Sequence, residues 1–187
     1  MNLVLTKNFY SWMRTVLLGS STSISASTSS TSGLNSNMTF CIEPMIDING
    51  TERTYLTFAS SYISRNVTLN YWNSINQSGT FFTIGSDNTP ATEDDHNVGS
   101  GYVWGADYST SHRAISNPQI VNGKGLLTFN VTFTAKTDII IGEIGMIKSL
   151  DTSSSSSANF LFGRIALDTP IELGAGESAT FQISVEI

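Results

Sequence analysis

Titratable side chains gather in one turn-rich segment, GSDNTPATEDDHNV, which runs from Gly85 to Val98. The segment carries Asp87, Glu93, Asp94, Asp95 and His96. Carboxylates on an irregular loop could coordinate Ca²⁺, which takes six to eight oxygen ligands. However, their spacing does not match the EF-hand pattern, and a solvated acidic loop is the commoner arrangement. We therefore predict no bound metal and no other cofactor.

Catalytic groups are difficult to assemble from this sequence. His96 and His112 both lie in loop-like sequence, without the His-x-x-x-His spacing of a metalloprotease helix, and no Gly-x-Ser-x-Gly elbow is present. The single cysteine, Cys41, has no partner for an internal disulfide and no neighbouring zinc ligands, so we expect a buried thiol. The sequence therefore predicts no catalytic residues and no enzymatic activity.

One basic residue, Arg164, interrupts the apolar run FLFGRIAL. If its guanidinium is buried, it needs a carboxylate, which Glu143 or Glu177 could supply from a neighbouring strand. An Arg164 side chain that faces solvent is the alternative.

Aromatic residues near predicted loops could stack on sugars if their rings are exposed. These residues are Tyr71, Trp72, Tyr102, Trp104 and Tyr108. The favoured alternative is that they close the ends of a β-sandwich, because large rings fill such openings well.

Composition limits the class of protein that positions these groups. The chain has 187 residues, of which 40% are hydrophobic and only 13% charged. An average soluble domain has about 25% charged residues, so Ser, Thr, Asn and Gly supply most of the polarity here. A net charge of −6 argues against direct binding of nucleic acid. No apolar run approaches the roughly 20 residues that span a bilayer, so we predict no membrane partner.

Short alternating or apolar runs separated by turn residues predict an all-β fold. The expected strands are 38–48, 55–60, 67–72, 80–84, 101–104, 126–135, 138–147, 159–167 and 180–187. This pattern indicates an antiparallel β-sandwich, either jelly-roll-like or immunoglobulin-like.

Several details of strand arrangement also follow from the pattern. The 138–147 run is apolar on both faces, which indicates a central strand with Gly142 and Gly145 at close approaches or bulges. The last strand should pair with the 126–135 or 139–147 run. We expect a turn at Thr169-Pro170 and a tight reversal at Gly174 and Gly176.

The N-terminal part of the chain has a different pattern. Apolar residues at spacings of three and four predict an amphipathic helix over residues 6–18, ending at Gly19. Such a helix is marginal alone, so it should dock on this domain or on a neighbouring subunit. The predicted partner-binding residues are Phe9, Trp12, Met13, Val16 and Leu17.

Two Ser/Thr-rich segments predict extended or mobile chain. Residues 20–36 read as a flexible or extended arm that could add a strand to a partner's sheet, and DTSSSSSANF, from Asp151 to Phe160, as a mobile hairpin loop. We therefore divide the chain into a helix and arm, residues 1–36, and a β-sandwich domain, residues 37–187.

Four segments together resemble small β-sandwich structural proteins of tailed bacteriophages. TFFTIGSDNTPATEDDHNVG resembles a Gly-, Thr-, Pro- and Asp-containing stretch of those proteins, with Ser86 where a second glycine often stands. IGEIGMI and the ending FLFGRIALDTPIELGAGESATFQISVEI are similar to their C-terminal part. The matching positions there are Glu143, Gly145, Arg164, Leu167, Pro170, Ile171, Gly176 and Glu177. The opening LTKNFYSWMRTVLLGSS is similar to their short N-terminal helix.

The resemblance implies a virion protein without catalytic activity. Such a subunit would be a capsid auxiliary or decoration protein, a collar protein or a tail adaptor, and would pack against other virion proteins, with a homo-oligomer expected. The alternative is a receptor- or carbohydrate-binding module of a phage tail or fibre.

Overall fold

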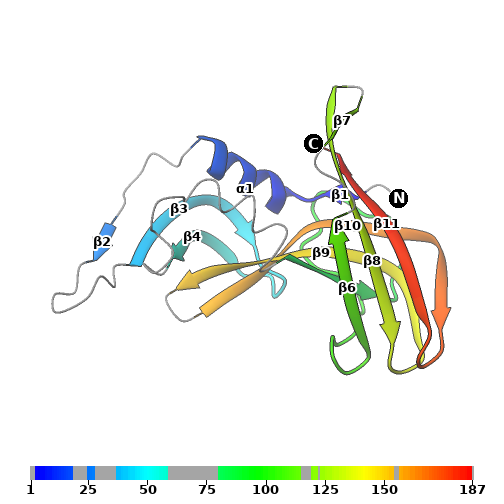
Figure 1. Ribbon diagram of the computed structural model, residues 1–187. Coiled ribbons are helices and arrows are strands. Elements are labelled where there is room, and N and C mark those ends of the chain that lie inside the picture. Colours follow the sequence, from blue (N-terminus) through cyan, green and yellow to red (C-terminus); the bar gives the residue numbers. More distant parts are fainter. Residues whose placement is uncertain are drawn as a thin grey trace.

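The computed structural model describes residues 3–18, 25–27, 37–58, 80–114, 119–121, 123–153 and 156–186. Eleven strands and one helix occur in these ranges (Figure 1). In chain order they are β1 (Val4–Leu5), α1 (Lys7–Leu18), β2 (Ser25–Ser27), β3 (Asn37–Ile46), β4 (Glu52–Phe58), β5 (Thr80–Gly85), β6 (Tyr108–Ala114), β7 (Gln119–Val121), β8 (Lys124–Ala135), β9 (Ile139–Ser153), β10 (Ser156–Leu173) and β11 (Ser178–Glu186). The predicted all-β fold with a short N-terminal helix is confirmed.

The body of the molecule consists of two antiparallel sheets packed face to face. One sheet has the order β1-β10-β9-β5, and the other has the order β11-β8-β6, with β7 paired to β8. The last strand, β11, pairs with β8, in the register Phe181↔Val131. This pairing selects the first of the two partners expected for the terminal strand, the 126–135 run.

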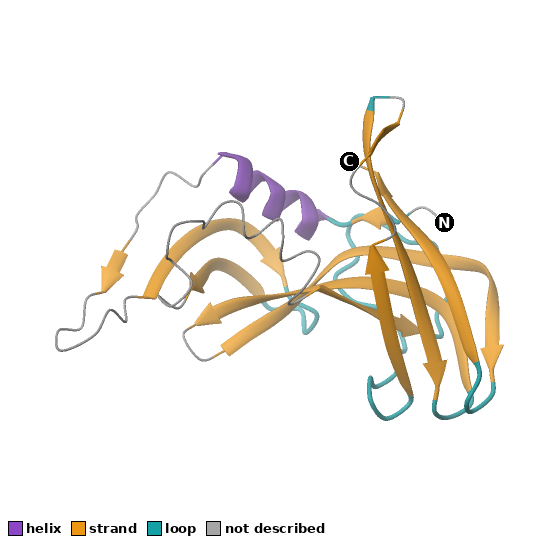
Figure 2. Ribbon diagram, in the orientation of Figure 1, coloured by secondary structure: helices purple, strands orange, loops and turns teal. Residues whose placement is uncertain are grey.

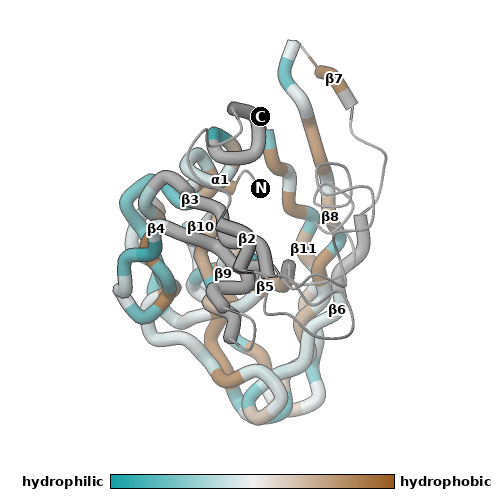
Figure 3. The backbone as a smooth tube through the Cα atoms, turned by 90° about the vertical axis from the view of Figure 1, so that its left-hand side faces the viewer, coloured by the Kyte–Doolittle hydropathy of each residue, from teal (hydrophilic) through white to brown (hydrophobic). Residues whose placement is uncertain are grey.

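Alternation along β8 and β11 builds one wall of the core. Phe129, Val131 and Phe133 are buried on β8, and Phe181 and Ile183 on β11 lie beside them. Figure 3 shows hydrophobic stretches, in brown, recurring along these two strands. Hydroxyl pairs occupy the opposite face, such as Thr132 with Thr180 at 2.8 Å between the two Oγ1 atoms. The period-two pattern therefore places apolar side chains in the core and hydroxyls on the outside.

The strand β9 is central, as the apolar 138–147 run predicted. It lies between β10 and β5, and the side chains from Ile141 to Lys148 are all buried. A Cβ at Gly142 would overlap the carbonyl oxygen of Ser86, and a Cβ at Gly145 would lie 2.6 Å from Val98 Cγ1. Both glycines therefore mark close approaches of chain to this strand, as expected.

The β9–β10 hairpin continues beyond the sandwich and supports a second group of elements (Figure 1). Helix α1 and the sheet β2-β3-β4 pack around this extension. We expected a mobile loop from Asp151 to Phe160, and this prediction is wrong for most of the segment. Strand β9 runs to Ser153, and β10 begins at Ser156. Leu150 pairs with Ala158 in this part of the hairpin, and both are buried, so tertiary packing orders a sequence that is weakly apolar by itself.

Helix α1 shares the core of the strands. The rings of Phe9 and Trp12 are buried and contact Phe162 of β10, with centroid distances of 5.9 and 5.5 Å. Asn8 fixes the helix to β3 because its Nδ2 donates to the Ile46 carbonyl and its Oδ1 accepts from the Ile46 amide, each at 2.8 Å. Residues 3–18 therefore pack with the main body, and the division at residue 36 stays a prediction.

Three local features of the strands differ from expectation. Residues 101–104 form no regular strand, and the segment makes only isolated bridges at Gly101 and Trp104. Strand β6 was not predicted, because Ser-Thr-Ser-His-Arg has no apolar alternation. Thr169-Pro170 makes no turn, since β10 continues past it with a register irregularity between Ala166 and Ile171. The expected strand 67–72 lies outside the described residues.

The β3–β4 turn is organised by a buried carboxylate. Asp47, which is 1% exposed, accepts hydrogen bonds from the Asn49 and Thr51 amides at 2.9 Å and from Arg53 Nη2 at 3.0 Å. Gly50 takes a φ of 81° in this turn. Burial alone would raise the pKa of Asp47, but the hydrogen bonds from Thr51, Arg53 and Asn49 hold it below its ordinary value.

We expect Asp47→Asn to lower the free energy of unfolding by about 1–3 kcal/mol near pH 7. The folded-state pKa of Asp47 is depressed, so its carboxylate stabilises the fold above the unfolded pKa of about 4 and loses this effect as the pH falls through the folded value. Urea unfolding from pH 7 to pH 3 should show the variant and the native chain converging in acid. A difference that stays constant over this range would contradict the assignment.

Candidate functional site: a buried arginine network and an exposed tryptophan turn

The acidic segment forms a long loop, residues 86–100, between the end of β5 and Gly101. The loop lies against β9. Its two ends are joined by the Gly85↔Gly101 bridge and by the Ser86 amide, which donates to the Ser100 carbonyl at 3.4 Å. Inside the loop, Asp87 accepts from the amide and hydroxyl of Thr89, and Asp95 accepts from those of Thr92. An Asx turn at Asp87 and the paired hydrogen bonds between Thr92 and Asp95 therefore shape the loop locally.

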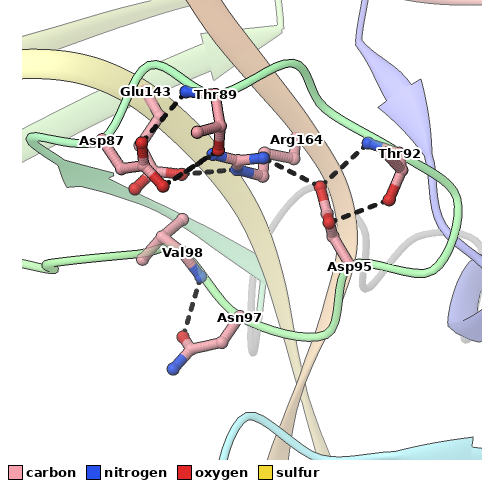
Figure 4. A network of polar contacts seen from close by, with 8 residues as sticks. All are labelled: Asp87, Thr89, Thr92, Asp95, Asn97, Val98, Glu143 and Arg164. Carbon is pink, nitrogen blue, oxygen red and sulfur yellow. Dashed lines mark hydrogen bonds and ion pairs between the residues drawn. The ribbon is translucent and has the colours of Figure 1, made fainter.

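Arg164 connects this loop to the sheet (Figure 4). Its guanidinium is buried, with Nε donating to Glu143 Oε2 on the neighbouring strand β9. From the loop, Asp95 Oδ2 accepts from Nη1 at 2.9 Å, and Asp87 Oδ2 lies 3.8 Å from Nη2. Thr89 Oγ1 also accepts from Nη2, at 3.4 Å.

The electrostatics of this arginine network follow from burial and pairing. Burial raises the pKa of Glu143, and the hydrogen bond from Arg164 offsets only part of that rise. For Asp95, burial would raise the pKa, but hydrogen bonds from Thr92 and Arg164 outweigh it and hold the pKa below its ordinary value. Burial also opposes the charge on Arg164, yet its carboxylate partners raise its pKa further, so the guanidinium stays protonated.

Small residues let the loop approach the network. A Cβ at Gly85 would overlap Glu143 Oε1 and the Gly99 carbonyl oxygen, and a Cβ at Gly142 would overlap the Ser86 carbonyl oxygen. Glu143 Oε1 has no hydrogen-bond partner among the described residues and is fully enclosed. The Arg164–Glu143 pair is thus buried, Asp87 and Asp95 are partly exposed, and together these charges attach the loop to the sheet.

A second set of polar contacts joins the loop to the N-terminal helix. Lys7 at the start of α1 forms an ion pair with Asp94, and its amide donates to the Glu93 carbonyl at 2.8 Å. Both side chains of the ion pair are largely exposed, so the pair itself contributes little stability.

The sequence predicted only some of the contacts that Arg164 makes. The expected partner for a buried Arg164 is confirmed as Glu143, whereas Glu177 lies elsewhere and accepts from the Gly174 amide. The acidic loop was expected to be solvated: Glu93, Asp94 and His96 are exposed, whereas Asp87 and Asp95 are only partly exposed and face Arg164. Spacing along the chain carries no signal for this contact, because the loop and β10 are distant in sequence.

The predicted partner-binding face of the helix is largely internal. Phe9 and Trp12 are buried in the core of this chain, and Met13 is partly buried against it. The side chains of Val16 and Leu17 lie outside the described residues. Partner binding by this face stays a prediction.

The loop aromatics separate into two groups. Tyr108 is buried and its hydroxyl lies 3.0 Å from Thr83 Oγ1, and Tyr102 is half-buried with its hydroxyl accepting from the Ile140 amide. Trp104 is 66% exposed, and its neighbour Val103 is 63% exposed. Tyr71 and Trp72 lie outside the described residues, as do the side chains of Cys41 and His112, while His96 is exposed.

No protein-family model, curated protein or solved structure matches this chain. Within the described ranges, no group of three or more His, Cys, Asp or Glu side chains is arranged to hold a metal ion. No helix in that part of the chain has the length and hydropathy needed to cross a membrane.

Proposed function

We propose that this protein is a non-enzymatic structural subunit of a tailed-phage virion, of the capsid auxiliary, decoration or connector type. It would assemble with other virion proteins and with copies of itself. The supporting observation is that three of the four segments carrying the resemblance converge on one contact. Asp87 and Asp95 come from the first segment, Glu143 from the second and Arg164 from the ending.

This convergence gives two of the matching positions, Glu143 and Arg164, a physical role together with two carboxylates of the first segment. Arg164 ties a long loop to the sheet through ion pairs and hydrogen bonds that are partly removed from water. Such a network is costly to bury and is better suited to fixing one conformation than to adding stability. A loop held in one conformation is useful to a subunit that must present a defined surface during assembly.

The proposal is tested first by the composition of purified particles. Mass spectrometry of particles from the source virus should detect this chain at a fixed ratio to the major capsid or tail protein. Its absence from particles that contain all other structural proteins would overturn the proposal.

The arm requires a separate variant, because the N-terminal segment supplies Leu3, Leu5, Phe9 and Trp12 to the core. Replacing residues 19–24 and 28–36 with Gly-Ser sequence of equal length, which keeps strand β2 and its pairing with β3, should preserve the thermal unfolding of the isolated protein and reduce its incorporation into particles. Normal incorporation would show that the arm is not needed for assembly. It would not test whether the protein is a virion subunit, which the particle composition tests.

A receptor- or carbohydrate-binding module is a second candidate, favoured by the exposure of Trp104. An exposed indole ring offers an apolar face on which a sugar ring can stack. A glycan array probed with the native chain and with Trp104→Ala tests this function. The native chain should bind a glycan, and the variant should not.

A further inference from the structure

The exposed tryptophan is held by a turn of defined conformation, here called the Trp104 turn, residues 102–107. The Val103 amide donates to Asp107 Oδ2 at 2.8 Å, and the Asp107 amide donates to the Val103 carbonyl at 2.9 Å. Gly105 takes a φ of 87° and its amide donates to the Tyr108 carbonyl. The backbone that carries Trp104 is therefore ordered before any partner binds, which lowers the entropic cost of binding.

The turn is also attached to the core at both ends. On one side, Tyr108 is buried and its ring lies 5.9 Å from that of Phe133. On the other side, the Tyr102 hydroxyl accepts from the Ile140 amide. Ile140 is itself 42% exposed, so this hydrogen bond brings a further exposed apolar residue next to Tyr102, at the start of the turn.

The Trp104 turn lies at the end of the sandwich where the turns following β8 and β10 also lie (Figure 2). Glu172 is the cross-strand neighbour of Ile140. Asp138 accepts from the Ala175 amide and Glu177 from the Gly174 amide, so these two carboxylates flank the same turn. The acidic rim is defined as Asp107, Asp138, Glu172 and Glu177.

The charge of the rim is largely uncompensated. None of its four carboxylates forms an ion pair with a described residue. The nearest basic residue along the chain, Lys136, donates its ammonium to the Gly105 carbonyl at 2.6 Å and its amide to the Asp107 carbonyl. The surface thus combines an exposed indole ring with an excess of negative charge.

We infer that the Trp104 turn and its acidic rim dock a cationic polypeptide segment, one that carries arginine or lysine, on a neighbouring protein. A guanidinium stacks on an indole face and also pairs with carboxylates, so one arginine side chain satisfies both parts of this surface. A neutral sugar could stack on the indole ring, but it would form no ion pair with the carboxylates. That the cation belongs to a protein rests on the proposed assembly role.

Direct binding by the purified full-length chain tests this inference. The probe is a fluorescein-labelled peptide of alternating Gly and Arg, followed by fluorescence anisotropy, with a Gly-Glu peptide of the same length as the reference. We expect Trp104→Ala to weaken binding by about tenfold or more, as for a central aromatic contact. Glu172→Gln should weaken it several-fold, and added salt should weaken it further.

Two matched variants separate this surface from the general acidity of the protein. Tyr10→Ala removes another exposed aromatic ring, on α1, and Glu52→Gln removes another exposed carboxylate, on β4. Both should change the affinity by less than about twofold. Circular dichroism of each variant confirms that the exposed substitutions leave the fold intact.

Two results would overturn the inference. Equal loss of affinity in the Tyr10 and Trp104 variants, or none in either, would show nonspecific attraction between opposite charges. Binding of a neutral oligosaccharide such as chitotetraose, with no binding of the Gly-Arg peptide, would assign the surface to sugar instead. Neither result bears on particle composition, which tests the virion assignment separately.

Discussion

Replacing Arg164 with methionine should lower the free energy of unfolding by about 3–5 kcal/mol, the range for breaking a buried ion pair from one side. Methionine fills a similar volume but leaves Glu143 fully buried and without its cation. Asp87 and Asp95 are less enclosed, with side chains 36% and 22% exposed, so they regain water more easily. Urea unfolding of the isolated protein measures the loss.

A second variant shows whether the cost arises from the unpaired charge. Arg164→Met combined with Glu143→Met removes both charges and should recover most of the lost stability, because two apolar side chains of similar size replace a buried pair at little cost. Lys124→Met serves as the control, since the Lys124–Glu186 pair is exposed and should contribute less than about 1 kcal/mol. An equal loss in the single and double variants would contradict the electrostatic explanation.

The same variants report on the acidic loop. If Arg164 is what fastens residues 86–100, amide hydrogen exchange in this loop should accelerate in Arg164→Met more than in the strands β8 and β11. Uniform acceleration across the chain would instead indicate global destabilisation, with no special role for Arg164 in holding the loop.

The contact between Arg164 and Glu143 shows how far a local pattern can lead. A basic residue inside an apolar strand needs a nearby carboxylate when buried, and Glu143 is on the adjacent strand of the predicted sheet, so the pair could be anticipated. The contribution of Asp87 and Asp95 could not. It depends on how a long loop folds back over β9, and loop closure leaves no periodic signal in sequence.

Strand prediction succeeded where one face of the strand is buried and failed where tertiary contacts supply the order. β8 and β11 alternate strictly, because each has one face in the core. β6 is an edge strand whose main described core contribution is Tyr108 at its first residue, so its remaining sequence looks like a loop. The hairpin through the Ser-rich tract likewise depends on packing with other elements.

The N-terminal helix illustrates a further limit of sequence patterns. Its apolar spacing predicted both the helix and a docking face, and both expectations required a second surface that the sequence did not identify. The structure supplies one within the same chain, since Phe9 and Trp12 lie against Phe162. Amphipathicity indicates that a face must be covered, and it does not distinguish an internal surface from a partner.

We accordingly expect Trp12→Ala to lower the free energy of unfolding by about 3–5 kcal/mol in the isolated protein, the usual cost of deleting a buried indole ring. Trp12 is 2% exposed, and its ring centroid lies 5.5 Å from that of Phe162 and 6.3 Å from that of Phe9. Tyr10→Ala is the control on the same helix. Tyr10 is 53% exposed, so its removal should cost less than about 1 kcal/mol.

The two substitutions decide whether the helix face is part of the core or reserved for a partner. A large loss for Trp12→Ala in the absence of other proteins means that the ring stabilises this chain directly, and any assembly defect then follows from unfolding. If Trp12→Ala melts like the native protein and only its incorporation into particles falls, the ring is exchanged onto a partner during assembly. In that case the helix must leave Phe162 when the partner binds.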